Sequence, residues 1–182
     1  QIDSDLHVLL IGNNCEGVAK SLSEISAIKK VLHAEATHYE NYLAENFAPL
    51  IVKVSEGYSH IISSANTFGK NLMPRVAALL DTSQISDIIK VVSSDTFLRP
   101  IYAGNAFATV KSTDAKKCVT IRPTSFEPCE TSGGSASIEK IEATEEFAAS
   151  KFIKREEVKS DRPELGTARV VISGGRGMQN GE

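Results

Sequence analysis

The sequence predicts an α/β fold: a three-layer sandwich with a mostly parallel sheet, helices on both of its faces and added antiparallel strands. Short apolar runs alternate with amphipathic helical segments over residues 6–80, as in parallel strands that are joined by crossover helices. After Asp81, short apolar runs follow one another with few helical segments between them, which favours antiparallel strands at the edge of the sheet.

The first half of the chain predicts strands and helices in alternation. The first strand ends at Gly12 and has the pattern of a strand buried on both faces. Strands are predicted at residues 6–12, 30–34 and 60–65, and helices at residues 16–27, 41–54 and 68–80. Pro49 lies inside the second helix, and Pro74 predicts a kink in the third helix or a start one turn later. Right-handed crossovers are expected between the strands.

The second half predicts mainly strands and loops. Four successive strands are predicted at residues 87–92, 96–102, 106–111 and 117–122, with Gly104-Asn105 as a hairpin signal. The composition of Thr131–Ser137 predicts a flexible surface loop. Alternating charged and apolar residues predict half-exposed strands at 137–143 and 152–158, and an apolar run predicts a strand at 168–173.

A polar, proline-containing segment, Ser160–Glu164, predicts a domain boundary. We assign residues 1–159 to an N-terminal α/β domain and residues 160–182 to a linker and the first strand and turn of a second, truncated domain. A complete doubly wound domain usually has more than three strands and three helices in its alternating part. We therefore expect that a first strand and helix precede Gln1.

Composition excludes several classes of protein. The 182 residues are 41% hydrophobic and 24% charged, which is ordinary for a soluble globular protein. The net charge of −3 argues against a nucleic-acid binder with a broad basic face. No apolar run approaches the ~20 residues of a membrane span, so direct membrane insertion is not expected. The cysteines, Cys15, Cys118 and Cys129, form no CxxC pair and are expected to be reduced thiols.

The glycine cluster Gly174-Gly175-Arg176-Gly177 is the main candidate site. Glycines after a strand let the backbone approach a phosphate group, and Arg176 could pair with an anionic group of a cofactor. Glycine turns after strands are also common without any ligand, so both interpretations stay open. The Thr131–Ser137 loop could cradle a phosphate as well, but it supplies no charge.

No catalytic or metal-binding set is predicted. The histidines, at positions 7, 33, 38 and 60, have no carboxylate or cysteine at metal-ligand spacing, and His7 and His60 are expected to be structural. No nucleophile–base pair is evident. The basic residues Lys70, Arg75, Arg99 and Lys111 are expected to be solvated, although Arg99, in a strand, needs a partner or an edge.

Several ordered segments together resemble the α subunit of electron transfer flavoproteins. The resemblance is specific over about residues 60–182 and weaker before them. It is carried by the segments Phe68–Ala78, Ile85–Ile89, Ile101–Ala106, Thr131–Ser137, Ser160–Leu165 and Val170–Gly177.

The resemblance implies an electron carrier subunit, not an enzyme. This family pairs with a β subunit, takes electrons from acyl-CoA dehydrogenases and related dehydrogenases of fatty acid β-oxidation, and passes them to a membrane quinone oxidoreductase. Its FAD lies mainly in the C-terminal domain, which would begin near Leu165, and its AMP belongs to the β subunit. Arg176 matches an arginine that contacts FAD, and the other FAD ligands would follow Glu182. The implied location is the mitochondrial matrix, or the cytoplasm in bacteria.

Two other functions remain as alternatives. The segment could act only as a module for heterodimerisation and docking. The glycine loop taken alone could also belong to an NAD(P)-binding enzyme, which would need an acidic residue ~20 positions further along the chain, beyond Glu182.

Overall fold

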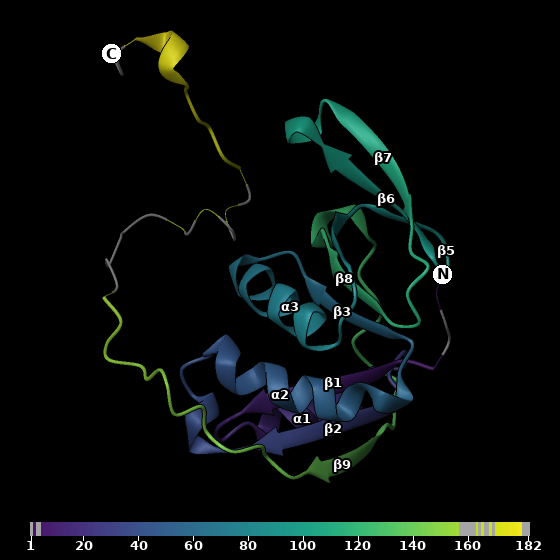
Figure 1. Cartoon of the computed structure of the whole chain (residues 1–182), viewed down its shortest axis with the longest axis vertical. Helices are drawn as coiled ribbons and strands as arrows, with labels where there is room; N and C mark the ends of the chain where they lie inside the picture. The colour runs from purple at the N-terminus through teal and green to yellow at the C-terminus, as the bar shows by residue number, and fades with distance from the viewer. Residues whose placement is uncertain are drawn as a thin grey trace. The chain divides into compact units, whose positions relative to one another are not determined.

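The structure, a computed structural model, describes residues 2, 5–156, 163, 165, 168 and 170–179. The chain divides into two compact units, Gln1–Phe152 and Ile153–Glu182, and each is described by itself. The first unit contains two parallel sheets, one antiparallel sheet and three α-helices (Figure 1). The predicted α/β fold is confirmed. The predicted boundary at residues 159 and 160 lies outside the described residues.

The first parallel sheet contains three of the predicted strands. Its central strand, β2 (Lys30–Glu35), pairs in parallel with β1 (His7–Gly12) and with β9 (Ser137–Ile141). β2 is buried along most of its length. β1 is only half-buried before Gly12, so the prediction of a strand buried on both faces was wrong. The reason is its position, because β1 forms one edge of the sheet in the order β1-β2-β9.

The second parallel sheet has the order β3-β8-β4. β8 (Lys117–Ile121) lies between β3 (His60–Ser64) and β4 (Gln84–Ile88) and runs parallel to both. The sequence predicts β8 as an antiparallel edge strand, and this was wrong. Its central residues, Cys118–Thr120, are fully buried, as expected for a strand with neighbours on both sides.

The antiparallel sheet is formed by β5 (Lys90–Ser93), β6 (Thr96–Ile101) and β7 (Ala106–Lys111). β6 and β7 form the predicted hairpin around Gly104-Asn105. The single strand predicted at 87–92 is in fact the end of β4 and most of β5. Asp87 has a φ of 57°, and the register of β4 shifts beside it, so the strand cannot continue straight through this position.

The three helices are α1 (Glu16–Ser23), α2 (Ala44–Val54) and α3 (Thr67–Leu79), as predicted apart from their bounds. α2 contains Pro49, and α3 runs through Pro74 without starting a turn later. α3 starts early because the side chain of Asn66 accepts a hydrogen bond from the backbone N–H of Gly69, 2.8 Å away.

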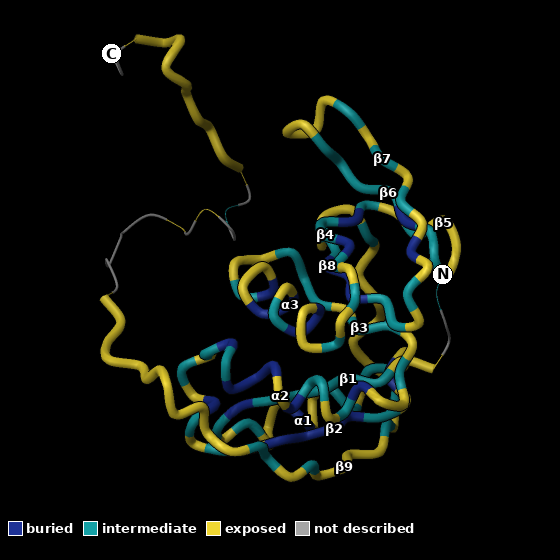
Figure 2. Tube along the Cα trace, viewed as in Figure 1, coloured by how far each residue is buried: buried dark blue, intermediate teal, exposed yellow. Residues whose placement is uncertain are grey.

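Three buried clusters show what covers the two faces of the parallel sheets. α2 and α3 pack on one face around Phe47, Leu72 and Cys118. α1 packs on the other face of the first sheet against Val31. The antiparallel sheet covers the corresponding face of the second sheet, where Phe97 is fully buried. Figure 2 shows this buried interior in dark blue.

The second unit contains little regular structure in its described part. Residues 152–156 form no strand, although the sequence predicts one at 152–158, and residues 157 and 158 lie outside the described part. Residues 168 and 170–173 also form no strand, so that prediction was wrong for them; residue 169 is not described. Alternating or apolar residues form strands only when a neighbouring strand pairs with them. A single 3-10 turn follows at Arg176–Met178.

Candidate functional site

The glycine segment that carries Arg176 forms a tight turn. The backbone N–H of Met178 donates to the carbonyl of Gly175 over 3.0 Å, and the N–H of Gln179 donates to the carbonyl of Arg176 over 3.1 Å. Arg176 is exposed, and its guanidinium has no hydrogen bond or ion pair within the described residues. It therefore presents a planar set of donors that can pair with a phosphate or another anion.

The glycines around Arg176 differ in what an added side chain would contact. A Cβ atom at Gly174 would lie 2.4 Å from the Sδ atom of Met178, but this is the end of a flexible, exposed side chain that can move aside. A Cβ atom at Gly175 or Gly177 would meet nothing within 4 Å, and neither residue has a positive φ. Nothing in this turn demands glycine at these two positions. They fit a backbone that a ligand approaches closely.

An apolar run precedes the turn and is exposed. Val170 and Val171 are largely solvent-accessible, and Ile172 is 95% exposed. Three consecutive β-branched residues of this kind usually pack in a sheet. Neither the strand before the turn nor the helix after it, which a phosphate loop uses, is formed in the described part of this unit. The described residues thus form the turn of such a loop without the strand and helix that flank it.

In the first unit, two arginines meet the bulge of β4. The Arg122 guanidinium pairs with both carboxylate oxygens of Asp87, which raises the pKa of Arg122. Arg99 donates from Nη2 to Ser86 Oγ over 2.8 Å, so the strand arginine has the partner that the sequence indicated it needs. The backbone N–H of Asp87 donates to Thr120 Oγ1 over 2.9 Å. These contacts hold the distorted end of β4 in place.

A second contact joins the carboxyl ends of β1 and β2. Cys15, just after β1, lies with its Sγ atom 3.1 Å from Nε2 of the buried His33, and Glu35 Oε2 lies 3.9 Å from the same nitrogen. Burial and the nearby Glu35 carboxylate raise the pKa of the Cys15 thiol, so the reactive thiolate is disfavoured. Sequence spacing does not predict this contact. The rule that parallel strands end at the same edge could have found it.

The other histidines in strands are structural, as predicted. Nδ1 of His7 is hydrogen-bonded to the Tyr58 hydroxyl, 2.6 Å away. Nε2 of the same ring lies 3.2 Å from Asp5 Oδ1. His60 Nε2 lies 2.6 Å from the carbonyl of Ser94, which can only accept, so His60 donates there. Its Nδ1 then accepts from the Ser59 hydroxyl, 2.8 Å away.

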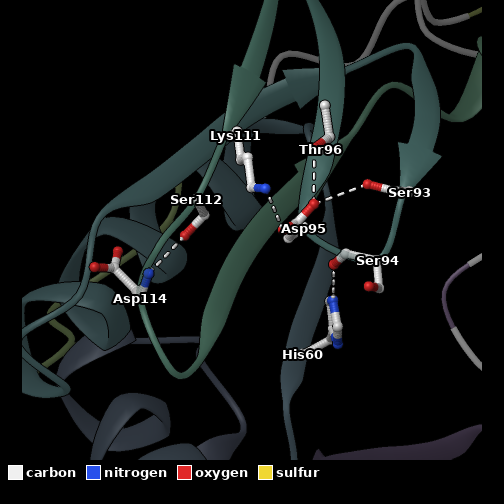
Figure 3. A network of polar contacts seen from close by, with 8 residues as sticks. All are labelled: His60, Ser93, Ser94, Asp95, Thr96, Lys111, Ser112 and Asp114. Atoms are coloured by element: carbon white, nitrogen blue, oxygen red, sulfur yellow. Dashed lines mark hydrogen bonds and ion pairs between the residues drawn. The ribbon is translucent and has the colours of Figure 1, made fainter.

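Figure 3 shows His60 beside a polar network that fixes the turn between β5 and β6. The Asp95 carboxylate accepts from the hydroxyls of Thr96 and Ser93 over 2.7 and 2.8 Å, and Lys111 lies 3.3 Å away. These hydrogen bonds lower the pKa of Asp95 to about 2. Lys111 is therefore paired rather than only solvated. The network stabilises a turn.

The Thr131–Ser137 loop is held to the end of α1, which differs from the flexible loop that its composition predicts. The N–H of Gly134 donates to Glu24 O over 2.7 Å, and the N–H of Ala136 donates to Ser23 O over 2.9 Å. A Cβ atom at Gly134 would lie 2.3 Å from Ile25 O, so this close approach requires glycine. The loop connects two elements and offers no charged group for a phosphate.

The cysteines are free, as predicted. Among the residues that the structure describes, no group of three His, Cys, Asp or Glu side chains could hold a metal ion. The described helices include none with the length and apolar character needed to cross a membrane.

Most of the first unit matches a known protein family. Residues 1–146 match the family described as "Electron transfer flavoprotein domain", which is most of the chain. This chain belongs to the electron transfer flavoprotein family.

Curated relatives are similar along the whole chain. Electron transfer flavoprotein subunit alpha of Pseudomonas aeruginosa is 50% identical over 181 residues, which cover 100% of this chain and 59% of that protein. The mitochondrial subunit alpha of Dictyostelium discoideum is 47% identical over 98% of this chain and 55% of that protein. The subunit alpha of Paracoccus denitrificans is 46% identical over 98% of this chain and 58% of that protein. The chain thus spans somewhat more than half the length of these relatives.

Proposed function

We propose that this chain is part of the α subunit of an electron transfer flavoprotein, an electron carrier without a substrate of its own. The observation that carries the proposal is the similarity to named α subunits over the whole chain, including the segment with Arg176. The side chains support it as well. The polar clusters of the described residues stabilise turns and strand ends. Cys15 does lie beside His33, but burial raises the pKa of its thiol, which disfavours the reactive thiolate.

The cofactor of the proposed carrier is FAD, which supplies the electron-transfer chemistry when bound. Arg176 would hold an anionic part of FAD with its exposed guanidinium, and Gly175 and Gly177 would let the backbone approach it. Most of the FAD ligands are proposed to follow Glu182. The exposed run Val170–Ile172 supports this, because the remainder of a domain is needed to bury it.

The proposed partners follow from the same function. A β subunit, which would hold the AMP, completes the carrier; acyl-CoA dehydrogenases and related enzymes donate the electrons, and a quinone oxidoreductase accepts them. Neither nucleic acid nor membrane insertion is part of the proposal. The location is proposed to be the mitochondrial matrix or, for a bacterial protein, the cytoplasm; relatives of both origins carry the α-subunit name.

The test is flavin uptake by the whole protein. The chain, extended past Glu182 to its natural end and produced with its β subunit, should purify with FAD. Arg176→Ala should lower the FAD content or shift the flavin reduction potential because a charged contact is lost. Arg176→Lys keeps the charge without the planar donors and should be intermediate. Binding of a nicotinamide cofactor in place of FAD would contradict the proposal.

A docking role for the first unit alone is the second candidate. Tyr102 and Phe107, at the tip of the β6–β7 hairpin, are 80% and 63% exposed, and aromatic residues are enriched in protein interfaces. If docking is the whole function, the chain should bind the β subunit tightly while the extended protein binds no flavin. Tyr102→Ser should then weaken binding, and Tyr42→Ser, at an exposed tyrosine outside the hairpin, should not.

A further inference from the structure

The segment after β9 is held to the first unit although it forms no helix or strand. This segment, residues 142–147, is here called the strap, and it follows β9 directly (Figure 1). Ala143, within it, packs against the buried cluster that α2 and α3 form on the sheets. Residues 148–156 differ, because all of them are exposed and none is in a helix or strand. The strap is thus the last part of the first unit with contacts to the core.

Two buried polar side chains bind the backbone of the strap. Tyr39 is fully buried, and its hydroxyl accepts a hydrogen bond from the N–H of Thr144 over 3.1 Å. The same hydroxyl is hydrogen-bonded to Thr144 Oγ1, 3.2 Å away. Asn46 is 2% exposed, and its Oδ1 accepts from the N–H of Phe147 over 2.8 Å. Burial of a hydroxyl or an amide is costly unless it is hydrogen-bonded, and here the strap supplies the partners.

A third side chain covers the end of the strap from outside. The Arg75 guanidinium of α3 lies over the ring of Phe147, with Cζ 5.8 Å from the ring centroid. Arg75 Nη2 also donates to Glu45 Oε1 of α2 over 3.0 Å, and both side chains of this ion pair are partly exposed. Exposed cation–π contacts and ion pairs are individually weak. This outer contact can therefore open more readily than the buried hydrogen bonds below it.

We propose that Tyr39, Asn46 and Arg75 form a clamp that holds the strap and thereby limits how far the second unit can move from the first. With the clamp closed, the free chain between the units starts at residue 148. With the clamp open, it starts at residue 142, and the freed strap adds about 20 Å of reach at full extension. The inference rests on contacts within the first unit and does not depend on the proposed electron-carrier function.

Digestion with a glutamate-specific protease tests the clamp in the whole protein with its β subunit. Glu146 lies in the strap and Glu156 beyond it, and each cleavage rate is divided by the rate at the same site in the unfolded chain. Cleavage after Glu146 should then be at least about 10-fold slower than after Glu156, because a protease needs a locally unfolded segment. Equal rates would overturn the proposal. Cleavage after Glu35, at the end of the central strand β2, reports unfolding of the whole unit.

Matched variants show whether the clamp causes this protection. Phe147 and Phe152 are 39% and 38% exposed, and Arg75 lies over the first of them. Phe147→Ala should raise cleavage after Glu146 at least about 3-fold, and Phe152→Ala should not change it. Tyr39→Phe keeps the ring in the core but loses the hydroxyl, and it should raise this cleavage by a similar factor. Unchanged cleavage, or an equal rise at the site in β2, would overturn the proposal.

Distances between two spin labels test the change in reach. Noncanonical amino acids in place of Lys53 of α2 and Lys151 carry the labels, so the native cysteines stay in place. A free chain from residue 148 to 151 has an r.m.s. span of about 11 Å, and one from residue 142 has about 17 Å. The Tyr39→Phe/Phe147→Ala double variant should therefore broaden the distance distribution by about half, whereas Phe152→Ala should leave it unchanged. An unchanged distribution in the double variant would overturn the proposal.

Discussion

The two units of the chain differ in how far their apolar residues are buried. The first unit buries side chains such as Val31, Leu50 and Phe97 completely, whereas in the second Ile172 is almost fully exposed. Because the burial of apolar surface is the main favourable contribution to folding, the first unit carries its own stability. The described part of the second unit has no comparable core. Unfolding of this chain should therefore report on the first unit alone.

The largest expected effect comes from emptying the core of the first unit. Phe97→Ala should lower the free energy of unfolding by about 3–5 kcal/mol, because it leaves a cavity between β6 and the second parallel sheet. Ile172→Ala should change it by less than about 0.5 kcal/mol. Urea denaturation of the two variants measures the difference. Similar losses would show that the second unit has a core of its own and would remove the contrast.

A smaller effect on stability is expected at Asn46, whose side chain holds the segment after β9 to the first unit. Its buried amide donates to His38 O over 2.9 Å and accepts from the Phe147 N–H over 2.8 Å, so it ties down the segment after β9. Asn46→Ala should cost about 1–3 kcal/mol, since two backbone groups lose their partner. Faster amide exchange at Phe147 should accompany the loss. The exposed Asn105 provides the control, and Asn105→Ala should leave both quantities unchanged.

The smallest effect concerns the acid stability of the first unit. The pKa of Asp95 is about 2, below the ordinary value of 3.8, mainly because the hydroxyls of Thr96 and Ser93 donate to it. The ionised group therefore stabilises the fold above about pH 4, and this contribution is lost as the pH falls through 2. Asp95→Asn should flatten the decline of Tm between pH 5 and pH 2 relative to the native chain. Asp81→Asn, at an exposed aspartate outside the network, should keep the native slope.

The sequence was sufficient for elements whose pattern is local. The three helices and most strands follow from apolar spacing, and the β6–β7 hairpin follows from Gly104-Asn105. The position of β8 was not predictable in this way, because its pairing with β3 and β4 depends on residues far away in the chain. The break at Asp87 also left no local signal, since Arg122 and Thr120, which contact it, lie more than thirty residues further along the chain.

The sequence indicated which residues could make up the candidate site, but not the structure around them. The glycine cluster and Arg176 stand in one short segment, and the structure forms a turn there with Arg176 exposed. The strand at 168–173 was not formed in its described residues, because a strand needs a neighbour to pair with. The contact between Cys15 and His33 was missed for a similar reason, since two strands must first be placed side by side.

The central place of β8 also determines the order in which the protein can assemble during its synthesis. β3 cannot complete its sheet until β8 has been made, and more than fifty residues separate Ser64 from Lys117. At ribosomal rates this delay is on the order of 3–10 s. During that interval β3, and after residue 88 also β4, lack the strand that joins them. Nascent chains should therefore depend on chaperones most strongly before residue 121 leaves the ribosome.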